Sequence, residues 1–333
     1  MKGLSTFPKG GIHPPAKKEL SASSEIKSGI IKSVSLIPLS QHLGSPAEAV
    51  VSVGDVVTEG MLLGRASGFI SANIHSPVPG KVTGIKNIYL PNGVKTSAIE
   101  IETEGEFDRL GKPQDPISWE NLSKEEILNL ILEMGLVGLG GATFPLHVKY
   151  SLPEGSRVEF FIINGAECEP YLTADDRLML EKSKEIFQGL AIAAKVLQPK
   201  EIIIVIEENK PEAIETEKKI AAECGLPVRV VPLKMKYPQG DEKQLIKAVT
   251  GREVPSGGLP LQVGCVVSNI GTLFALYEAV VYRKPLIERI VTVSGGAVKN
   301  PANLKARIGT PIGALLEECG GFIKPPAKIV LGG

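Results

Sequence analysis

Two short stretches of the chain combine residue types that could bind a phosphorylated ligand. Residues 138–145 read Gly-Leu-Gly-Gly-Ala-Thr-Phe-Pro, and residues 164–171 read Asn-Gly-Ala-Glu-Cys-Glu-Pro-Tyr. Three glycines in four positions remove the Cβ atoms that would keep a ligand away from the backbone, so the first stretch can present several amide groups to a phosphate. The second stretch supplies an amide side chain and two carboxylates. We name them the glycine loop and the acidic segment.

The element that must position the acidic segment is an apolar run over residues 158–163, which predicts a buried strand. This strand would place Asn164, Glu167 and Glu169 at its carboxyl end, where open α/β sheets bind ligands. A second interpretation stays open, because Glu167 and Glu169 could instead cap a helix that begins near Thr173. The glycine spacing matches neither the dinucleotide fingerprint nor the P-loop, so the glycine loop alone does not identify a ligand.

The chain after the acidic segment alternates between predicted helices and strands. Helices are predicted over residues 175–197 and 211–224, and strands over residues 201–206 and 228–231. Strands separated by helices of this length indicate a parallel βαβ core with right-handed crossovers. Further helices are predicted over residues 124–133, with Ser123 as the N-cap, and over residues 241–249, 272–282 and 312–318.

The first third of the chain has a different pattern. Residues 1–28 are rich in Pro, Gly, Ser and Lys, which predicts an extended arm that wraps over another domain. Residues 30–104 read as short strands between glycine turns, for example at residues 49–51, 53–57 and 74–82, which predicts a small all-β sandwich or barrel.

Composition and charge narrow the class of protein. Lys plus Arg and Asp plus Glu both number 37, whereas a nucleic-acid-binding protein usually shows a basic excess. No apolar stretch approaches the roughly 20 residues that span a bilayer. The four cysteines include no C-x-x-C pair, so no local iron–sulfur or zinc site is expected. Cys168 lies between two glutamates, which would raise the pKa of its thiol, and we predict a packing role for it.

The glycine loop and acidic segment occur together with three other ordered motifs. These are Phe-Pro-Lys-Gly-Gly-Ile-His-Pro-Pro at residues 7–15, Tyr-Pro-Gln-Gly-Asp-Glu at 237–242 and Val-Ser-Asn-Ile-Gly-Thr-Leu at 267–273. The set closely resembles the C subunit of Rnf-type ion-translocating electron transport complexes. It is similar, more distantly, to the flavin- and NADH-binding subunit of respiratory complex I.

The resemblance implies an α/β protein of several domains. After the arm at residues 1–28, residues 29–105 resemble a biotinyl/lipoyl-type barrel-sandwich hybrid, or hammerhead. The expected hairpin tip at residues 66–72 has no lysine, which excludes a swinging-arm carrier unless a lysine outside the hairpin is modified. Residues 120–285 would form a Rossmann-like FMN- and NADH-binding domain. Residues 286–333 would form a β-grasp module of the SLBB (soluble-ligand-binding β-grasp) type, running from a strand near residue 290 through residues 328–330.

The resemblance also implies which residues bind the flavin and the nicotinamide cofactor. It assigns no catalytic side chain and no metal ligand, because hydride transfer belongs to the flavin. Lys149 would neutralise a phosphate and Phe144 would pack on a ring. The implied cofactor-binding residues are Gly138, Gly140, Gly141, Phe144, Lys149, Asn164, Glu167, Glu169, Glu242, Asn269 and Thr272. Two positions depart from complex I, since Leu139 replaces an arginine and Leu259 replaces an aromatic residue.

The function that the resemblance implies is electron transfer between NADH and ferredoxin, coupled to ion translocation. The protein would be a peripheral subunit at the cytoplasmic face of the membrane, with the other Rnf subunits as partners. Rnf C subunits normally continue into a ferredoxin-like domain, so we expect this sequence to be truncated and iron–sulfur clusters to lie only in the missing domain. A second hypothesis is a docking subunit with a degenerate nucleotide site, which Leu139 and Leu259 support.

Overall fold

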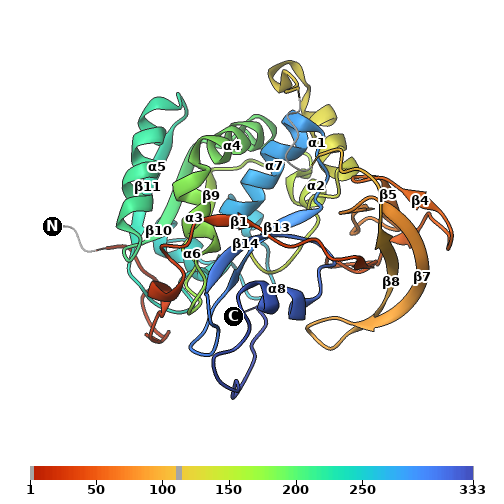
Figure 1. Ribbon diagram of the computed structural model, residues 1–333. Coiled ribbons are helices and arrows are strands. Elements are labelled where there is room, and N and C mark those ends of the chain that lie inside the picture. Colours follow the sequence, from red (N-terminus) through yellow and green to blue (C-terminus); the bar gives the residue numbers. More distant parts are fainter. Residues whose placement is uncertain (1–3, 110–114, 333) are drawn as a thin grey trace.

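A four-stranded parallel sheet forms the centre of the computed structural model, which describes residues 4–109 and 115–332. Its order is β11-β10-β9-β12 (Figure 1). The strands are β9 (Phe160–Gly165), β10 (Glu201–Glu207), β11 (Val228–Leu233) and β12 (Cys265–Asn269). The chain moves outward from β9 to β10 and β11, and then returns to the other side of β9 as β12. The strand order therefore reverses between β9 and β12.

Helices cover both faces of this sheet, as its continuously apolar strands require. Most lie on one face, in a core that includes Phe161, Leu190 and Leu276. The other face is covered by α6 (Glu242–Thr250) and a 3₁₀ turn, Pro260–Val263. The helices of the first face are α1 (Lys124–Glu133), α2 (Leu146–Tyr150), α3 (Ala174–Glu181), α4 (Ser183–Leu197), α5 (Pro211–Glu223) and α7 (Ile270–Tyr282).

The predicted parallel βαβ core is confirmed, and α1 begins after Ser123 as expected. Ser123 Oγ accepts a hydrogen bond from Glu126 N at 3.2 Å, and the Glu126 carboxylate accepts one from Ser123 N. The single helix predicted over residues 175–197 is wrong. The chain leaves the helical conformation at Lys182, with φ −133°, so that α3 and α4 take different directions. Neither Gly nor Pro marks this break in the sequence.

The N-terminal region is a two-sheet β-structure, as predicted. One sheet contains β2 (Val34–Pro38), β8 (Lys95–Thr103), β7 (Gly80–Tyr89) and β4 (Val56–Val57). The other contains β3 (Glu48–Ala49), β5 (Leu62–Arg65) and β6 (Ile74–His75). The strands expected at residues 49–51 and 53–57 are only two residues long. The long hairpin of β7 and β8 was not predicted, because one of its faces is largely exposed and polar.

The C-terminal unit is a three-stranded sheet with one helix. It consists of β13 (Glu288–Val293), β14 (Ala302–Arg307) and α8 (Ile312–Glu318). Its third strand is β1 (Ile26–Ser28), which pairs in parallel with β14. Residues 328–330, which we expected to belong to this fold, form no strand. Ile329 and Val330 are 55% and 63% exposed, so they have no core to join.

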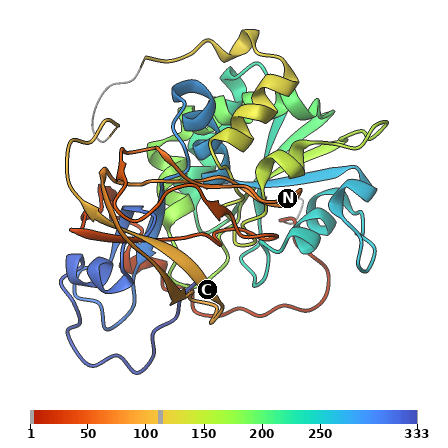
Figure 2. The ribbon, with the colours of Figure 1, turned by 90° about the vertical axis from the view of Figure 1, so that its right-hand side faces the viewer.

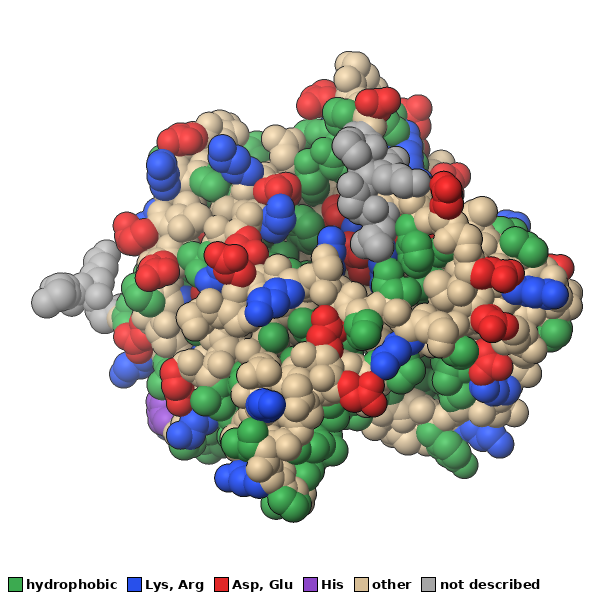
Figure 3. Space-filling model, in the orientation of Figure 1, with side chains coloured by type: hydrophobic (Ala, Val, Ile, Leu, Met, Phe, Trp, Pro, Cys, Tyr) green, Lys and Arg blue, Asp and Glu red, His purple; other side chains and the backbone are tan. Residues whose placement is uncertain are grey.

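The N-terminal arm runs across the central domain before it becomes β1 (Figure 1). Ser5 and Ile12 form isolated bridges with Leu233 and Tyr237, and a short 3₁₀ turn follows at Lys18–Leu20. Leu36 N also donates to Gly309 O, and the β-structure lies beside the C-terminal unit (Figure 2). Acidic and basic side chains are interspersed over the face in Figure 3, in keeping with the zero formal net charge.

Candidate functional site

A cavity of about 330 Å³ opens where the order of the central sheet reverses. Asn164 at the end of β9 and Asn269 at the end of β12 are partners in register, and both line it. Parallel α/β sheets bind ligands at this kind of position, outside the carboxyl ends of the strands. The cavity extends towards β13 of the C-terminal unit, whose Arg289 also lines it. Two structural units therefore share one cavity.

Six of the predicted binding residues line this cavity. They are Gly140, Gly141, Asn164, Glu167, Glu169 and Asn269. The other five are not among the described residues that line it: Gly138, Phe144, Lys149, Glu242 and Thr272. Their positions relative to the first six define how the site is built.

The glycine loop is held at both ends and open in the middle. Gly138 N donates to Phe144 O at 2.9 Å, and Leu139 N donates to Thr272 Oγ1 at 2.9 Å, so Gly138, Phe144 and Thr272 fix the loop. A Cβ at Gly140 would lie 2.9 Å from the Cβ of Asn269. Gly141 has φ +125° and would have no heavy atom within 4 Å of an added Cβ. The loop thus leaves space that only glycine at these positions keeps free.

The two asparagines shape the cavity through bonds to the protein. Asn269 is the N-cap of α7, since its Oδ1 accepts from Thr272 N at 3.3 Å, and its Nδ2 donates to Asp175 Oδ2 at 2.6 Å. Asn164 donates from Nδ2 to Gly240 O at 2.8 Å, and its Oδ1 accepts from Ala166 N. Each amide therefore links two loops of the site, and in this way they hold the cavity walls in place.

Glu167 performs the capping role that the sequence left open, and it also lines the cavity. Its Oε1 accepts from Asp175 N at 2.8 Å, in the first turn of α3. Its Oε2 is buried and has no hydrogen-bond partner among the described residues. Burial raises the pKa of Glu167, while the nearby ammonium groups of Lys18 and Lys210 oppose that rise. The side chain thus brings an unused acceptor to the cavity.

Asp175 and Arg289 are residues of the cavity that the sequence interpretation missed. Burial, followed by the charge of Glu167, raises the pKa of Asp175 to about 7. The Arg289 guanidinium donates to Leu139 O at 3.3 Å. In the sequence, Asp175 looks like an ordinary acidic residue in the first turn of a helix, and Arg289 lies in a different structural unit. Neither residue has a neighbouring sequence pattern that would mark it as part of a binding site.

Lys149 and Glu242 lie together, outside the lining. Lys149 Nζ is 2.9 Å from Glu242 Oε1, and both side chains are partly exposed. Glu242 is two residues from Gly240, which does line the cavity. The pair therefore stands near the cavity with its two charges neutralising each other.

Cys168 has the packing role that was predicted. Its Sγ accepts from Gly240 N at 3.2 Å, so the thiol joins the acidic segment to the loop that carries Glu242. Burial raises the pKa of Cys168 to about 11, with a smaller contribution from Glu169. The direction agrees with the sequence argument, although burial outweighs the flanking carboxylates. A thiol with this pKa is a poor nucleophile at neutral pH.

The two positions that depart from complex I have different surroundings. Leu139 lines the cavity, whereas Leu259 is 69% exposed and is not among the described lining residues. Within residues 4–109 and 115–332, no helix is long and apolar enough to cross a membrane.

Three family models match successive parts of the chain. Residues 6–106 match the RnfC barrel sandwich hybrid domain, residues 131–278 match the Nuo51 FMN-binding domain, and residues 290–333 match the SLBB domain. The matches follow the three structural units described above. They agree with the fold class that the sequence predicted.

Curated relatives match almost the whole chain. The C subunit of a proton-translocating ferredoxin:NAD(+) oxidoreductase complex from Clostridium ljungdahlii is 47% identical over 98% of this chain and 71% of its own length. The C subunit of a Na(+)-translocating ferredoxin:NAD(+) oxidoreductase complex from Acetobacterium woodii is 41% identical over 98% and 73%. The C subunit of an ion-translocating oxidoreductase complex from Rhodobacter capsulatus is 42% identical over 98% and 63%.

Among solved structures, the chain is similar to the NAD+-reducing [NiFe]-hydrogenase in its air-oxidised state. The match has a TM-score of 0.52 and 22% identity, and it covers 60% of this chain and 39% of that one. At this identity the likeness supports the fold and nothing further.

Proposed function

Because this chain belongs to the family of C subunits of ion-translocating ferredoxin:NAD(+) oxidoreductase complexes, we propose that it binds FMN and NADH at the cavity and transfers electrons between NADH and iron–sulfur carriers. One observation carries the proposal. A single cavity at the reversal point of a parallel sheet is lined by the glycine loop, Asn164, Asn269 and Glu167, whose Oε2 accepts no hydrogen bond from the described residues.

The residues of the cavity fit a flavin nucleotide. Gly140 and Gly141 leave backbone amides accessible in space that side chains would fill, which suits a phosphate. The Oε2 of Glu167 accepts no hydrogen bond among the described residues, so it can accept one from an N–H or O–H group of a ligand. Leu139, Leu178 and Phe274 add apolar surface to the lining, which suits a ring system.

In this proposal the chain contributes binding, orientation and exclusion of water. Bound FMN would supply the hydride and single-electron chemistry. The glycine loop would hold the phosphate, and Lys149 would turn from Glu242 towards it. Glu167 and Glu169 would orient the ring and the nicotinamide cofactor. No side chain has to form a covalent bond, since close and correct placement supplies the rate advantage.

The partners and location are also proposals. We propose that the protein is a peripheral subunit at the cytoplasmic face of the membrane, held by the other subunits of an Rnf complex. Electrons would reach ferredoxin through iron–sulfur clusters in a domain outside the present sequence. The chain spans 63–73% of the length of the three relatives named above.

A second candidate function is a docking subunit whose nucleotide site is degenerate. Leu139 favours it, because a leucine offers no side-chain donor to a phosphate where complex I has an arginine. The exposed Leu259 favours it as well, because a cofactor's adenine would find no aromatic partner there. In this case the β-structure and the C-terminal unit would carry the function.

Flavin binding distinguishes the two candidates. The protein is incubated with FMN, desalted, and examined by visible absorbance before and after anaerobic addition of NADH. We expect retained flavin that is bleached by NADH. Gly140→Val should abolish retention because its side chain would collide with Asn269, whereas Gly296→Val should not, because nothing lies within 4 Å of a Cβ at that position. Absence of FMN binding by the folded wild-type protein would favour the docking function.

A further inference from the structure

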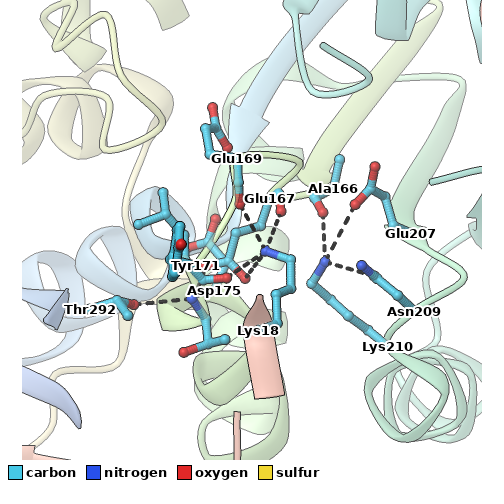
Figure 4. Close-up of polar contacts among 12 residues, drawn as sticks. Lys18, Ala166, Glu167, Glu169, Tyr171, Asp175, Glu207, Asn209, Lys210 and Thr292 are labelled. Carbon is cyan, nitrogen blue, oxygen red and sulfur yellow. Dashed lines mark hydrogen bonds and ion pairs between the residues drawn. The ribbon is translucent and has the colours of Figure 1, made fainter. Parts of the chain in front are cut away.

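Lys18 is a buried lysine of the N-terminal arm, and its ammonium group contacts the backbone of the acidic segment. It lies in the 3₁₀ turn Lys18–Leu20 and is only 9% exposed. Its Nζ donates to the backbone oxygens of Glu167 at 2.8 Å, Glu169 at 3.1 Å and Leu172 at 2.5 Å. Figure 4 shows the ammonium group beside Glu167 and Glu169. All three donors of the ammonium are used to hold the segment that carries the site carboxylates.

A second buried lysine supports the same segment from the other side. Lys210, at 3% exposure, donates from Nζ to Ala166 O at 2.8 Å and to Asn209 Oδ1 at 3.2 Å, and its ammonium is 3.8 Å from Glu207 Oε2. Lys210 thus has a carboxylate of its own, and Glu207 is 1% exposed. The carboxylate nearest to Lys18 is Glu167, whose Oε2 is 4.0 Å away.

We propose that Lys18 is a positioning residue of the cofactor site, which shapes the acidic segment through its three carbonyl bonds and favours the carboxylate form of Glu167 as a hydrogen-bond acceptor. The arm would then be part of the site and not only a surface wrapping. The carbonyl bonds alone would make Lys18 a structural residue. Its distance from Glu167 Oε2 gives it the second role, because that oxygen has no other partner among the described residues.

The charges around Glu167 determine how its ionisation responds to Lys18. Lys18 and Lys210 favour the carboxylate, and the hydrogen bond from Asp175 N does so as well. Burial and the charge of Asp176 favour the protonated acid. The carboxyl group of Asp175, which is itself more basic than usual, also faces Glu167. Removing one of two buried ammonium groups should therefore shift the balance towards the acid.

The first test needs no cofactor. The titration of the Glu167 carboxyl carbon is followed by NMR in the wild-type protein and in Lys18→Met, and the signal is assigned by its loss in Glu167→Gln. We expect the midpoint to rise by about one pH unit or more in Lys18→Met, since an opposite charge within 4–6 Å lowers a carboxyl pKa by about 1–3 units. Lys17→Met, at the exposed neighbouring position, should leave the midpoint unchanged. An unchanged midpoint in folded Lys18→Met would overturn the ionisation role.

Lys18→Arg separates charge from shape, and it keeps the proposal testable if Lys18→Met does not fold. A guanidinium retains the charge, but its planar fork cannot serve three carbonyls that converge on one nitrogen. We expect a Glu167 midpoint close to that of the wild type together with altered amide signals over residues 166–172. A variant with wild-type amide signals in that segment would contradict the positioning role.

The link to cofactor binding rests on the proposed function and is measured separately. In Lys18→Met, FMN affinity should fall at least tenfold near neutral pH and should recover towards the wild-type value as the pH is raised, because Glu167 then ionises in the variant as well. In a Glu167→Gln background, Lys18→Met should no longer move the pH dependence. If wild-type protein binds no FMN, the proposed function fails, whereas the NMR titration still decides whether Lys18 controls Glu167. If FMN binds with equal affinity to the wild type and to Lys18→Met, the proposed function stands and only the role of Lys18 in positioning the cofactor site is lost.

Discussion

The backbone amide of Leu139 donates a hydrogen bond to the hydroxyl of Thr272, 2.9 Å away, and so ties the glycine loop to the first turn of α7. Thr272 is 1% exposed, so water cannot replace it as the acceptor. The same residue donates its own amide to Asn269 Oδ1. One threonine thus connects the glycine loop with the asparagine that ends β12.

Thr272→Val should therefore weaken FMN binding without removing any direct ligand. The valine keeps the shape but leaves Leu139 N unpaired, which costs about 1–3 kcal/mol, and the loop has to be ordered again when the ligand binds. We expect the FMN dissociation constant, measured by fluorescence quenching, to rise about tenfold. Thr83→Val, on exposed β7, is the control. Equal dissociation constants for the two variants would show that the Thr272 bond is irrelevant to the loop.

The Lys149–Glu242 pair predicts that replacing Lys149 changes the affinity for FMN but not the affinity for riboflavin. Lys149→Gln should weaken FMN about tenfold, because its ammonium would neutralise the phosphate, and should leave riboflavin unaffected because riboflavin has no phosphate. Both affinities can be measured by the same quenching titration. Lys200→Gln, at an exposed lysine beyond α4, should change neither. A parallel loss for FMN and riboflavin would place Lys149 elsewhere than at the phosphate.

Glu217 predicts how stability changes with pH. It is fully buried in α5, accepts one hydrogen bond from Ser183 Oγ at 2.7 Å, and burial raises its pKa to about 7. The folded protein therefore holds a proton that the unfolded chain releases near pH 4.5. Because the native state binds more protons in this interval, the contribution of Glu217 to stability falls as the pH rises from about 4.5 to about 7.

Glu217→Gln should remove this loss. Relative to the wild type, its free energy of unfolding should rise between pH 5 and pH 8, by up to roughly 3 kcal/mol for a shift of this size. Urea unfolding at several pH values measures the difference. Glu215→Gln, on the exposed face of the same helix, should follow the wild type. A constant difference across this pH range would mean that Glu217 is ionised normally.

The contact of Glu59 with Arg307 predicts a large cost for one substitution. Arg307 Nη2 lies 2.6 Å from Glu59 Oε1, Arg307 Nε lies 3.4 Å from Glu288 Oε2, and these three side chains are nearly inaccessible. Arg307→Met would leave the buried Glu59 carboxylate without its cation, whereas Glu288 would keep Lys284 and Lys305. We therefore expect a loss of about 3–5 kcal/mol in urea unfolding.

A surface arginine gives the matched comparison for this substitution. Arg229 pairs with Glu201 across an exposed part of β10 and β11, and Arg229→Met should cost at most about 1 kcal/mol. Adding Glu59→Gln to Arg307→Met should recover part of the loss, because it removes the charge that the first substitution leaves unpaired. No recovery in the double variant would argue against Glu59 as the partner.

The parts of the fold that the sequence predicted are those with local signals. The continuous apolar run in β10 and the helices around it indicated a parallel core, and Ser123 with Glu126 marked the start of α1. The break at Lys182 escaped prediction because its residue has no conformational signature. The third strand of the C-terminal unit escaped because it comes from residues 26–28, far from its partner in the sequence.

The residues of the candidate site also divide into those that the sequence predicted and those that it did not. The glycines and asparagines were found because their types and motifs are informative in themselves. Lys18 is 149 positions from Glu167, and its burial follows only from the path of the arm. Asp175 has a shifted pKa because neighbouring loops cover it, which no local pattern reveals. Long-range packing, rather than residue type, decides the roles of these side chains.

The pairing of β1 with β14 has a consequence for biosynthesis. Ile26 leaves the ribosome long before its partner Asn303 is made, because nearly the whole central domain lies between them in the sequence. At roughly 5–20 residues per second, the early strand waits on the order of tens of seconds for the edge that receives it. During that interval its backbone donors and acceptors face water or other chains. Because β1 is made early and paired late, its sheet can be completed only after β14 has been synthesised.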